Sequence, residues 1–387
     1  MAEKKLVPEL RFPGFGGEWE EKKLSKLVNI ARGKSKYRPR NANILYEDGK
    51  YPFVQTGDIK DAGLYLTKFS QKYSEYGLKQ SKLWSAGTLC VTIAANIAET
   101  AILGIDACFP DSIIGIVPLK NKADVTFIKY QFDKLKNDIQ RLSEGVAQDN
   151  LNLEKLSNII FTSPGFKEQE KIASFLSDID EHIQLLEKKR EALERYKKGV
   201  MQKIFNREIR FKDDAGKDFP DWDEKRLGEI CEKRSSSISA NELLNNGGNY
   251  KIYGATGFLR NVDFYQEEEP YISIVKDGAG VGRILLCDAK SSVLGTLDII
   301  KPKENINIRF LYAVISAITF EKYTTGSTIP HIYFKDYAKE KVIIPCLSEQ
   351  QKIASFLSSI DKSIDQVDHQ LLRAKEYKKG LLQKMFV

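Results

Sequence analysis

Residues 168–180 read EQEKIASFLSDID, and residues 349–361 read EQQKIASFLSSID. The second copy follows the first by 181 residues, and the same offset pairs Phe205 with Phe386 without a gap. Self-similarity at a fixed offset indicates a tandem duplication, which has to be recognised before any other pattern is interpreted. We therefore expect a chain built from two related halves.

Each copy of the repeated motif opens a segment with helical periodicity, at residues 166–206 and 347–387. Apolar residues recur there at alternating steps of three and four, the spacing of the a and d positions of a coiled coil. Two long helices of this kind need a partner, and we expect them to pair with each other in antiparallel orientation. The helix-pairing residues that we expect are Ile172, Leu176, Ile179, Ile183 and Leu186 in the first segment, and Ile353, Leu357, Ile360, Ile364 and Val367 in the second.

The segments that precede the helices, residues 1–165 and 207–346, have the pattern of globular domains. Short β-branched and aromatic runs alternate with turns rich in glycine, asparagine and proline, and helical spacing appears at residues 127–142 and 308–322. The two domains open alike, with WEEKKL at residues 19–24 and WDEKRL at residues 222–227. This second pair is offset by 203 residues, so the first domain carries about 22 more residues in its middle.

The expected fold is therefore α+β, with two mixed α/β domains separated by two long helices that form an antiparallel coiled coil. The domains are expected at residues 1–165 and 207–346, with a central spacer helix at 166–206 and a C-terminal spacer helix at 347–387. In this arrangement each domain sits at the N-terminal end of its own helix, at opposite ends of a rod. The tandem repeat then has a pseudo-twofold axis across the helices.

Composition narrows the class of protein. The 387-residue chain has a formal net charge of +7, with about +5 in residues 1–165 and about −1 in residues 207–346, which allows a polyanionic partner. The N-terminus lacks the apolar core of a signal peptide, and no long apolar run occurs, so we expect a cytoplasmic protein without a membrane segment. Five scattered cysteines favour neither disulfides nor zinc.

Patterns associated with catalysis are incomplete. Gly33-Lys34-Ser35 resembles the end of a phosphate-binding loop, but Val28 stands where its first glycine belongs. The glycines of residues 276–282 have turn spacing, and no methyltransferase tetrapeptide is present. The three histidines show no metal-ligand spacing. We therefore expect a non-catalytic chain without a metal site.

The repeated EQxKIASFLSxID openings, the YKKGxxQKxF endings of both helical segments and the W-x-x-x-x-L domain entrances together resemble the DNA specificity subunit of type I restriction-modification systems. The resemblance implies two target recognition domains, each reading one half of a bipartite double-stranded DNA target. It implies helices that set the spacing and dock two methyltransferase subunits, with restriction and translocation subunits completing the complex. It also implies that S-adenosylmethionine, ATP and Mg are used by those partner subunits, with no cofactor in this chain.

The most informative local stretch for DNA binding is ARGKSKYRPR, residues 31–40. Its basic residues recur at every second position, so an extended chain would present them on one side about 6.6 Å apart, close to the spacing of successive phosphates. Solvated basic loops show the same pattern, but the family resemblance favours a phosphate clamp. The predicted clamp residues are Arg32, Lys34, Lys36, Tyr37, Arg38 and Arg40.

Base-reading residues are expected in polar turns, where amides suit adenine and basic side chains suit guanine. The candidates are Thr56, Asn96, Gln148 and Asn150 in the first domain, and Tyr253, Thr256, Lys276, Ser327, Thr328 and His331 in the second. Two other classes of function remain open at this point. One is a coiled-coil scaffold without sequence specificity, and the other is an enzyme with a degenerate methyltransferase or nuclease site.

Overall fold

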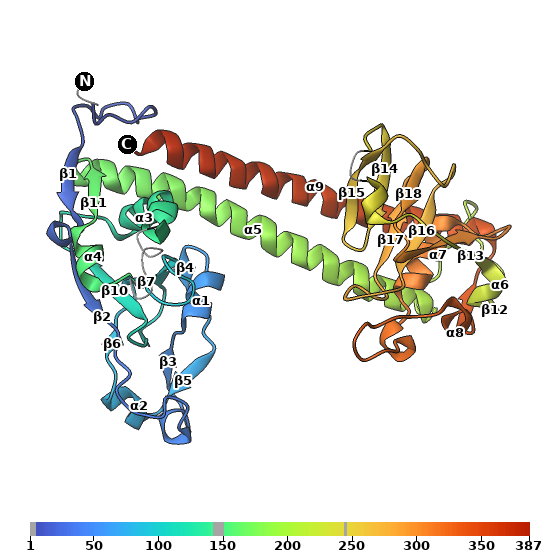
Figure 1. Ribbon diagram of the computed structural model, residues 1–387, viewed down its shortest axis with the longest axis horizontal. Helices are drawn as coiled ribbons and strands as arrows, with labels where there is room; N and C mark the ends of the chain where they lie inside the picture. The colour runs from blue at the N-terminus through green and yellow to red at the C-terminus, as the bar shows by residue number, and fades with distance from the viewer. Residues whose placement is uncertain (1–4, 142–150, 244–245) are drawn as a thin grey trace. The chain divides into compact units, whose positions relative to one another are not determined.

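The computed structural model describes residues 5–141, 151–243 and 246–387. The chain divides into two compact units. Unit 1 consists of Met1–Lys189 together with Asp368–Val387, and unit 2 consists of Arg190–Val367. Each unit contains one globular domain and a part of each of the two long helices (Figure 1).

The globular part of unit 1 is built on a five-stranded sheet in the order β2-β10-β7-β8-β4, with a second sheet in the order β5-β3-β9-β6. Strand β10 is buried on both faces, because Ile114 and Ile116 join one hydrophobic core while Ile113 joins another. Helix α3 supplies Ile128 and Phe132 to the first of these cores. The sheet thus lies between a helix layer and the second core.

The strands of unit 1 are β1 Glu20–Lys23, β2 Val28–Arg32, β3 Tyr51–Phe53, β4 Tyr65–Leu66, β5 Gln71–Tyr73, β6 Leu83–Trp84, β7 Leu89–Thr92, β8 Thr100–Leu103, β9 Ala107–Cys108, β10 Ile113–Pro118 and β11 Ile160–Ser163. Its shorter helices are α1 Thr56–Asp61, α2 Glu75–Lys79, α3 Val125–Arg141 and α4 Leu153–Asn158, with 3-10 turns η1 Leu24–Lys26 and η2 Asn43–Leu45.

The globular part of unit 2 repeats the central sheet of unit 1. Its order, β13-β19-β16-β17, matches β2-β10-β7-β8, and every neighbouring pair in both series is antiparallel. The accompanying sheet, β15-β14-β18, also repeats unit 1, because it matches β5-β3-β9 with one antiparallel and one parallel pair in each. The described parts of the two domains therefore share both sheets, which unit 1 extends with the short strands β4 and β6.

The strands of unit 2 are β12 Asp223–Arg226, β13 Cys231–Ser235, β14 Tyr250–Gly254, β15 Gly257–Val262, β16 Tyr271–Val275, β17 Ile284–Cys287, β18 Ser291–Val293, β19 Leu297–Pro302 and β20 Lys341–Ile344. Its shorter helices are α6 Leu227–Ile230, α7 Ile308–Ser316 and α8 Phe334–Tyr337, with 3-10 turns η3 Ala240–Leu243 and η4 Phe320–Tyr323. The helix expected at 308–322 is thus interrupted after Ser316, because Thr319 adopts an extended conformation.

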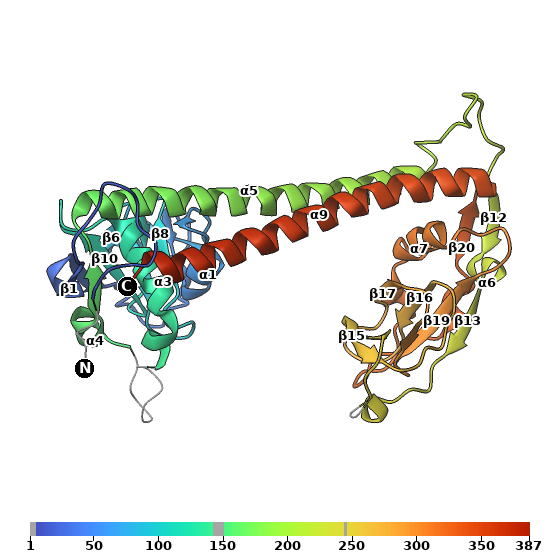
Figure 2. The same cartoon turned by 90° about the horizontal axis from the view of Figure 1, so that it is seen from above.

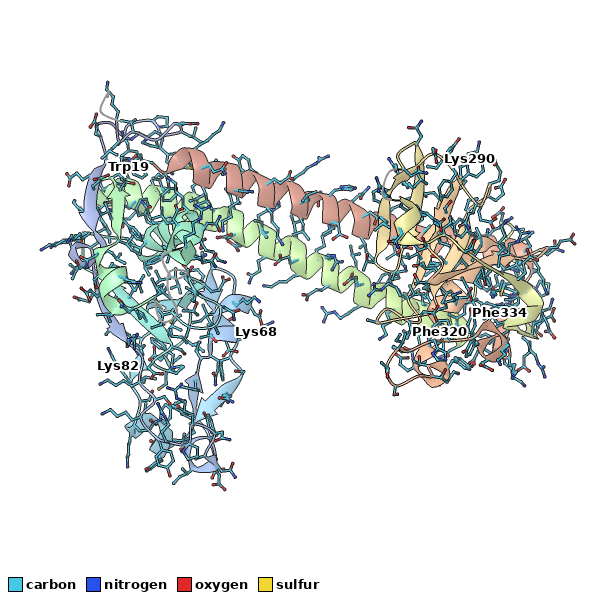
Figure 3. The ribbon with its side chains drawn as sticks, viewed as in Figure 1. Trp19, Lys68, Lys82, Lys290, Phe320 and Phe334 are labelled. Atoms are coloured by element: carbon cyan, nitrogen blue, oxygen red, sulfur yellow. The ribbon has the colours of Figure 1, made fainter. Side chains whose placement is uncertain are left out.

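The two similar domain entrances form equivalent strands. β1 pairs with β11 and β12 pairs with β20, so each entrance lies beside the strand that leads into a long helix. Trp19 is buried against Phe127 and Phe386, and Figure 3 shows it beside the C-terminal end of α9. Trp222 is buried in the core of unit 2.

A buried ion pair closes each entrance, and the sequence pattern did not reveal it. Arg11 donates to the Glu168 carboxylate over 2.8 Å, and Arg210 donates to Glu349 over 2.8 and 3.0 Å. Both glutamates are the first residue of the repeated EQ motif and are almost fully buried. Their carboxylates also lie in the first turn of a long helix, where negative charge is favourable.

The glutamine of each EQ motif is a second anchor. Gln169 donates through Nε2 to the Pro164 and Lys122 carbonyls and accepts from the Asp124 amide. Gln350 makes the same three bonds, to the Pro345 and Asn305 carbonyls and from the Asn307 amide. The motif therefore ties each long helix to the loop that precedes α3 or α7.

The long helices are α5 Phe166–Phe205 and α9 Leu347–Met385. Inside unit 1, Lys375 contacts Glu187 and Lys378 contacts Asp180, each over 2.6 Å. The later lysine on α9 contacts the earlier acidic residue on α5, so the two helices run antiparallel. Figures 1 and 2 both show the C-terminal end of α9 beside the N-terminal part of α5 in unit 1.

The opening motif of each long helix contacts the closing YKKG motif of the other helix. Asp180 ends the first quoted motif and binds Lys378 of the second YKKG, while in unit 2 Asp361 ends the second motif and binds Lys197 of the first YKKG over 2.5 Å. The lysines occupy seam positions that lack an apolar residue. Polar pairs in such positions specify register and orientation at some expense in stability.

The helix-pairing residues lie on the inner face of this pair. Ile179 and Ile364 are half-buried, and the other eight are buried. Ile172 and Leu176 share a core with Leu381 and Met385 in unit 1. In unit 2, Val200 and Ile204 share one with Ile353 and Leu357.

Candidate nucleic-acid interface

The basic segment begins where β2 leaves the central sheet of unit 1. Gly33 is required at that point, because a Cβ there would lie 2.3 Å from the Pro110 carbonyl oxygen and 2.4 Å from that of Phe109. The close approach allows the Lys34 amide to donate to the Phe109 carbonyl over 3.0 Å. The segment is therefore held against the sheet as it turns away from it.

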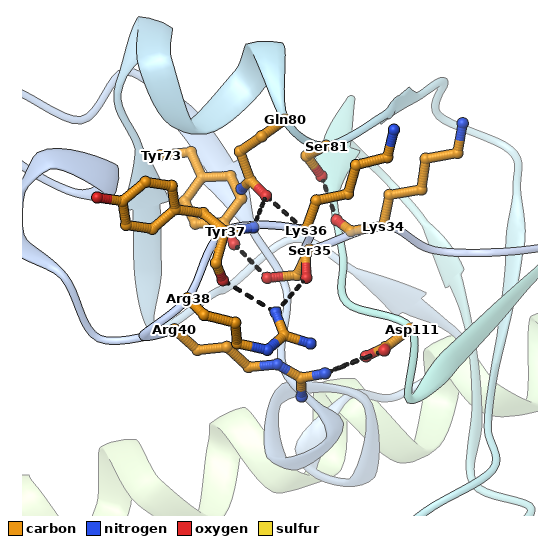
Figure 4. A network of polar contacts seen from close by, with 10 residues as sticks. All are labelled: Lys34, Ser35, Lys36, Tyr37, Arg38, Arg40, Tyr73, Gln80, Ser81 and Asp111. Carbon is orange, nitrogen blue, oxygen red and sulfur yellow. Dashed lines mark hydrogen bonds and ion pairs between the residues drawn. The ribbon is translucent and has the colours of Figure 1, made fainter.

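Exposure alternates over the first part of the segment, as an extended chain requires. Gly33 and Ser35 are buried, whereas Arg32, Lys34 and Lys36 are exposed. In Figure 4 the Lys34 and Lys36 side chains extend in the same direction. These three cations agree with the row of charges expected from the sequence.

Neighbouring side chains fix the backbone between these cations. Gln80 accepts through Oε1 from the amides of Lys36 and Tyr37, over 2.6 and 3.0 Å. Ser81 donates to the Lys34 carbonyl over 2.7 Å, and the Ser35 hydroxyl lies 3.2 Å from the Tyr73 hydroxyl (Figure 4). These amides and this carbonyl are thus satisfied within the protein, which leaves the lysine side chains for another partner.

The expectation of one row of five cations is wrong beyond Lys36. Arg38 folds back and donates to the carbonyls of Ser35 and Tyr37 over 2.6 and 2.9 Å, and Arg40 binds Asp111 over 2.8 Å (Figure 4). The regular strand ends at Arg32, so the period-two geometry has no ladder to maintain it further along. Tyr37 is half-buried and packs edge-on against Tyr76.

A cavity of about 370 Å³ lies behind this segment in unit 1. The Tyr46 hydroxyl donates to the Arg40 carbonyl over 2.7 Å, and burial of the ring, with the nearby Tyr73, raises the pKa of Tyr46 to about 12. The lining, mostly polar with a buried phenylalanine, consists of Ser35, Arg40, Asn41, Tyr46, Phe53, Gln55, Gln71, Pro110 and Ser112.

The remaining predicted residues of unit 1 are separated from one another. Thr56 begins α1 beside Gln55, which lines the cavity. Asn96 lies in the loop between β7 and β8, where its carbonyl accepts from the Glu99 amide. Gln148 and Asn150 lie outside the described residues.

The hairpin of β14 and β15 holds Tyr253 and Thr256 in unit 2. The Tyr253 hydroxyl donates to Asp288 over 3.0 Å, and burial together with that carboxylate raises its pKa, so the side chain has its donor already engaged. Thr256 is exposed at the turn between the two strands. Thr256 is therefore the more exposed of these two predicted residues, and Tyr253 is half-buried.

Two loops of unit 2 bring together the other four predicted residues. The Gly278 amide donates to the Pro330 carbonyl and the Ile332 amide to the Lys276 carbonyl, over 2.9 and 3.0 Å, so the segment after β16 lies against residues 324–332. His331 forms isolated bridges with Asp277 and Thr325. Lys276 and His331 are half-buried, whereas Ser327 and Thr328 are exposed.

Apart from Lys276, the sequence analysis missed a charged cluster formed by residues of β13 and β19 with Glu267 and Lys276. Buried Glu267 faces Lys301 and, over 3.7 Å, Arg234, while buried Asp298 faces Lys233 and Lys276, each over 3.7 Å. The guanidinium of Arg234 remains largely exposed. A signal was present, since Glu232-Lys233-Arg234 follows the second entrance at about the distance at which the basic segment follows the first.

Within residues 5–141, 151–243 and 246–387, no group of three or more His, Cys, Asp or Glu side chains is placed to hold a metal ion. No helix in that part of the chain is long and apolar enough to cross a membrane.

The described geometry is that of two duplicated domains with basic loops, on a pair of long helices, and comparison with known proteins identifies the family. Residues 16–195 and 220–374 match the model of the type I restriction modification DNA specificity domain. The two matches cover most of both halves. The chain belongs to this family.

Relatives agree with that assignment, and a solved structure shares the fold. The chain is 23% identical over 403 residues to the type I restriction enzyme MjaIX specificity subunit of Methanocaldococcus jannaschii, with 95% of this chain and 92% of that protein covered. It is 20% identical to the EcoprrI specificity subunit of Escherichia coli, over 89% of this chain and 88% of that protein. A crystal structure of the S subunit of a type I restriction-modification system from M. genitalium has the same fold, with a TM-score of 0.68, 18% identity and coverage of 98% and 99%.

Proposed function

We propose that this chain is the DNA specificity subunit of a type I restriction-modification complex, in which each unit reads one half of a bipartite target. The observation that carries this proposal is the duplicated domain. The two units repeat both sheets and the same Arg–Glu entrance but differ in the segments between the shared strands, where unit 1 adds α1, β4, α2 and β6. A shared scaffold with different surface loops suits two related readers of different sequences.

In unit 1 the residues that would contact phosphates are Arg32, Lys34 and Lys36, which are exposed and alternate with buried residues. In unit 2, Arg234 on β13, the counterpart of β2, and Lys276 after β16 stand beside buried carboxylates that compensate part of their charge. Unit 1 therefore supplies more of the sequence-independent attraction to DNA. Sequence would be read by loop side chains at base edges, a separate set of contacts.

Methylation and cleavage are assigned to partner subunits, which would use S-adenosylmethionine, ATP and Mg. The antiparallel helices set the spacing between half-sites and present outer faces on which two methyltransferase subunits dock. A structural neighbour with the same fold comes from work on complex assembly and conformational transition of the type I R-M system, and has a TM-score of 0.55 over 98% of this chain. The chain itself contributes recognition and no chemistry.

The test maps methylated adenines in DNA from cells that carry the chain with its methyltransferase subunit. Methylation in both halves of one split sequence is expected, with none when either protein is absent. Methyl transfer by the purified chain alone would refute the non-catalytic role. Equal binding to all duplexes at moderate salt would instead favour a scaffold without specificity.

A further inference from the structure

The loop at residues 324–332 of unit 2 presents an apolar side chain at its surface. Ile329 is 63% exposed, the highest value for a large hydrophobic side chain among the described residues. Ser327 and Thr328 are exposed beside it in the sequence. A single exposed apolar residue is common on protein surfaces and has no meaning by itself. Its setting is what distinguishes Ile329.

Backbone hydrogen bonds hold this loop from both sides. Thr325 and His331 exchange amide-to-carbonyl bonds of 2.9 and 2.8 Å, which close the loop on itself. Pro330 accepts from the Gly278 amide, and buried Ile332 anchors the end of the loop in the core of unit 2. The loop is thus a fixed projection whose shape does not depend on burying Ile329.

The backbone at Gly326 adds a further restraint. Its φ is +91°, and a Cβ at this position would lie 2.4 Å from the Ile329 carbonyl oxygen and 2.9 Å from Nδ1 of His331. Only glycine permits that conformation and that approach without a shift. The His331 ring nitrogen also lies 3.2 Å from the same carbonyl, so the backbone of Ile329 is held from two directions.

Resting on the proposed function, we propose that Ile329 reads the C5 methyl group of a thymine in the half-site bound by unit 2. The thymine methyl is the apolar group that base pairs present in the major groove. Ile329 and the half-exposed ring of Tyr333, which lies 5.0 Å from the His331 ring, are together too small for a protein-binding patch, which needs a contiguous apolar area on the order of several hundred Å². The neighbouring Ser327 and Thr328 hydroxyls suit the polar base edges that flank a methyl group.

The corresponding position in the first half supports a reading role for the loop. The 181-residue offset pairs Ile329 with Gln148, so the two halves have different residue types at one position of the repeat. An amide suits adenine, whereas an aliphatic side chain suits the thymine methyl. Different residue types at one aligned position of the sequence are what two readers of unlike half-sites require.

The test uses the full chain and a duplex obtained by selecting binders from a random pool. Each thymine of the selected sequence is replaced in turn by deoxyuridine, which removes only the methyl group. We expect one replacement to weaken binding about fourfold, the effect of leaving one methyl group unburied. Ile329→Ala should abolish the difference between thymine and deoxyuridine at that position, and Ile329→Val should retain part of it.

Phe258→Ala is the matched control, because Phe258 is 57% exposed in the same unit but lies on β15. This variant should keep the full thymine preference, and thermal melting of all variants should match that of the parent chain. The inference is overturned if no replacement weakens binding, or if it weakens the parent and Ile329→Ala equally. It is also overturned if Ile329→Ala weakens every duplex alike. A selection that enriches no sequence would refute the proposed function itself, a distinguishable result.

Discussion

At the residue scale, the side chains of the basic segment of unit 1 are placed partly by the alternation of an extended chain and partly by hydrogen-bond partners from elsewhere in the domain. Arg32, Lys34 and Lys36 keep the alternation that the sequence predicts, whereas Arg38 and Arg40 are drawn to carbonyl groups and to Asp111. Arginine carries five donors in a planar fork, so a nearby carboxylate or pair of carbonyls captures it readily. Phosphate contact is therefore expected from three of the five cations.

Replacing Lys34 and Lys36 by alanine should weaken binding to all duplexes alike. Phosphate contacts carry no sequence information, and removing one lysine–phosphate interaction should flatten the slope of log K against log salt by about 0.9. Arg38→Ala is the control, because its guanidinium is engaged with carbonyls and the slope should stay unchanged. A changed base preference with an unchanged slope in the double variant would show that these lysines read bases.

The buried carboxylates at the domain entrances yield a prediction about stability. Glu349 accepts from Arg210 and from the Trp222 indole, so Arg210→Ala would leave a buried charge without its main partner. Breaking such a pair costs about 3–5 kcal/mol. Thermal or urea unfolding should show a large loss for Arg210→Ala, and a much smaller one for Lys341→Ala, whose partner Glu224 is exposed. Equal small losses would mean that the entrance pair does not hold the domain.

At the element scale, repetition and heptad spacing were enough to predict the long helices. The segments expected at 166–206 and 347–387 differ from α5 and α9 by one or two residues at their ends. Antiparallel pairing also followed from the sequence. The partners of the seam lysines did not, because a polar residue at a seam position does not reveal which carboxylate lies opposite.

The candidate site was predictable only in part, for a related reason. Loop side chains such as Tyr253 and Arg40 take their positions from partners far along the chain, at Asp288 and Asp111. Sequence proximity contains no information about such contacts, whereas helix periodicity is local. Apart from Lys276, the charged cluster around Glu267 and Asp298 was missed because it assembles from strands and loops that lie far apart in sequence.

The Lys378–Asp180 pair is expected to stabilise the helix pairing measurably. Both side chains are less than 20% exposed, and Tyr130 also donates to Asp180 over 2.8 Å. Lys378→Asp should destabilise unit 1 by about 1.5–3 kcal/mol, the range for hydrogen bonds to charged groups. Adding Asp180→Lys should restore part of this loss, as a double-mutant cycle would show.

The Lys375–Glu187 pair provides the control for that experiment. Its side chains are about half exposed, so reversing its charges should change stability by at most about 1 kcal/mol. If both cycles gave the same small coupling, the seam pair would not set register, and the apolar residues alone would.

At the scale of the whole molecule, the two units have separate cores, which predicts that their specificities can be exchanged. Replacing residues 220–345 by the corresponding domain of a relative should change one half of the recognised sequence and leave the other intact. Selection from a random duplex pool would reveal the new target. A change in both halves would indicate one composite reading surface.

The repeated helices are also expected to act as a ruler for the half-sites. Inserting seven residues after Glu187 and seven after Asp368 preserves the heptad seam and lengthens each helix by about 10.5 Å. The insertions leave Lys378 with Asp180, and Lys197 with Asp361, on their own sides of the added turns. Both helices therefore become longer while each of these ion pairs keeps its partner.

Selection from duplexes with varied spacers provides the measurement for this insertion. An extra 10.5 Å, roughly, corresponds to about three base pairs of B-DNA, so the half-sites should stay the same while the preferred spacer lengthens by about three. Three base pairs also rotate the duplex by about 100°, so binding to stiff spacers should fall while flexible spacers retain it. Because neither recognition domain is altered, undiminished binding at the original spacing would show that the distance between half-sites is set by something other than the helices.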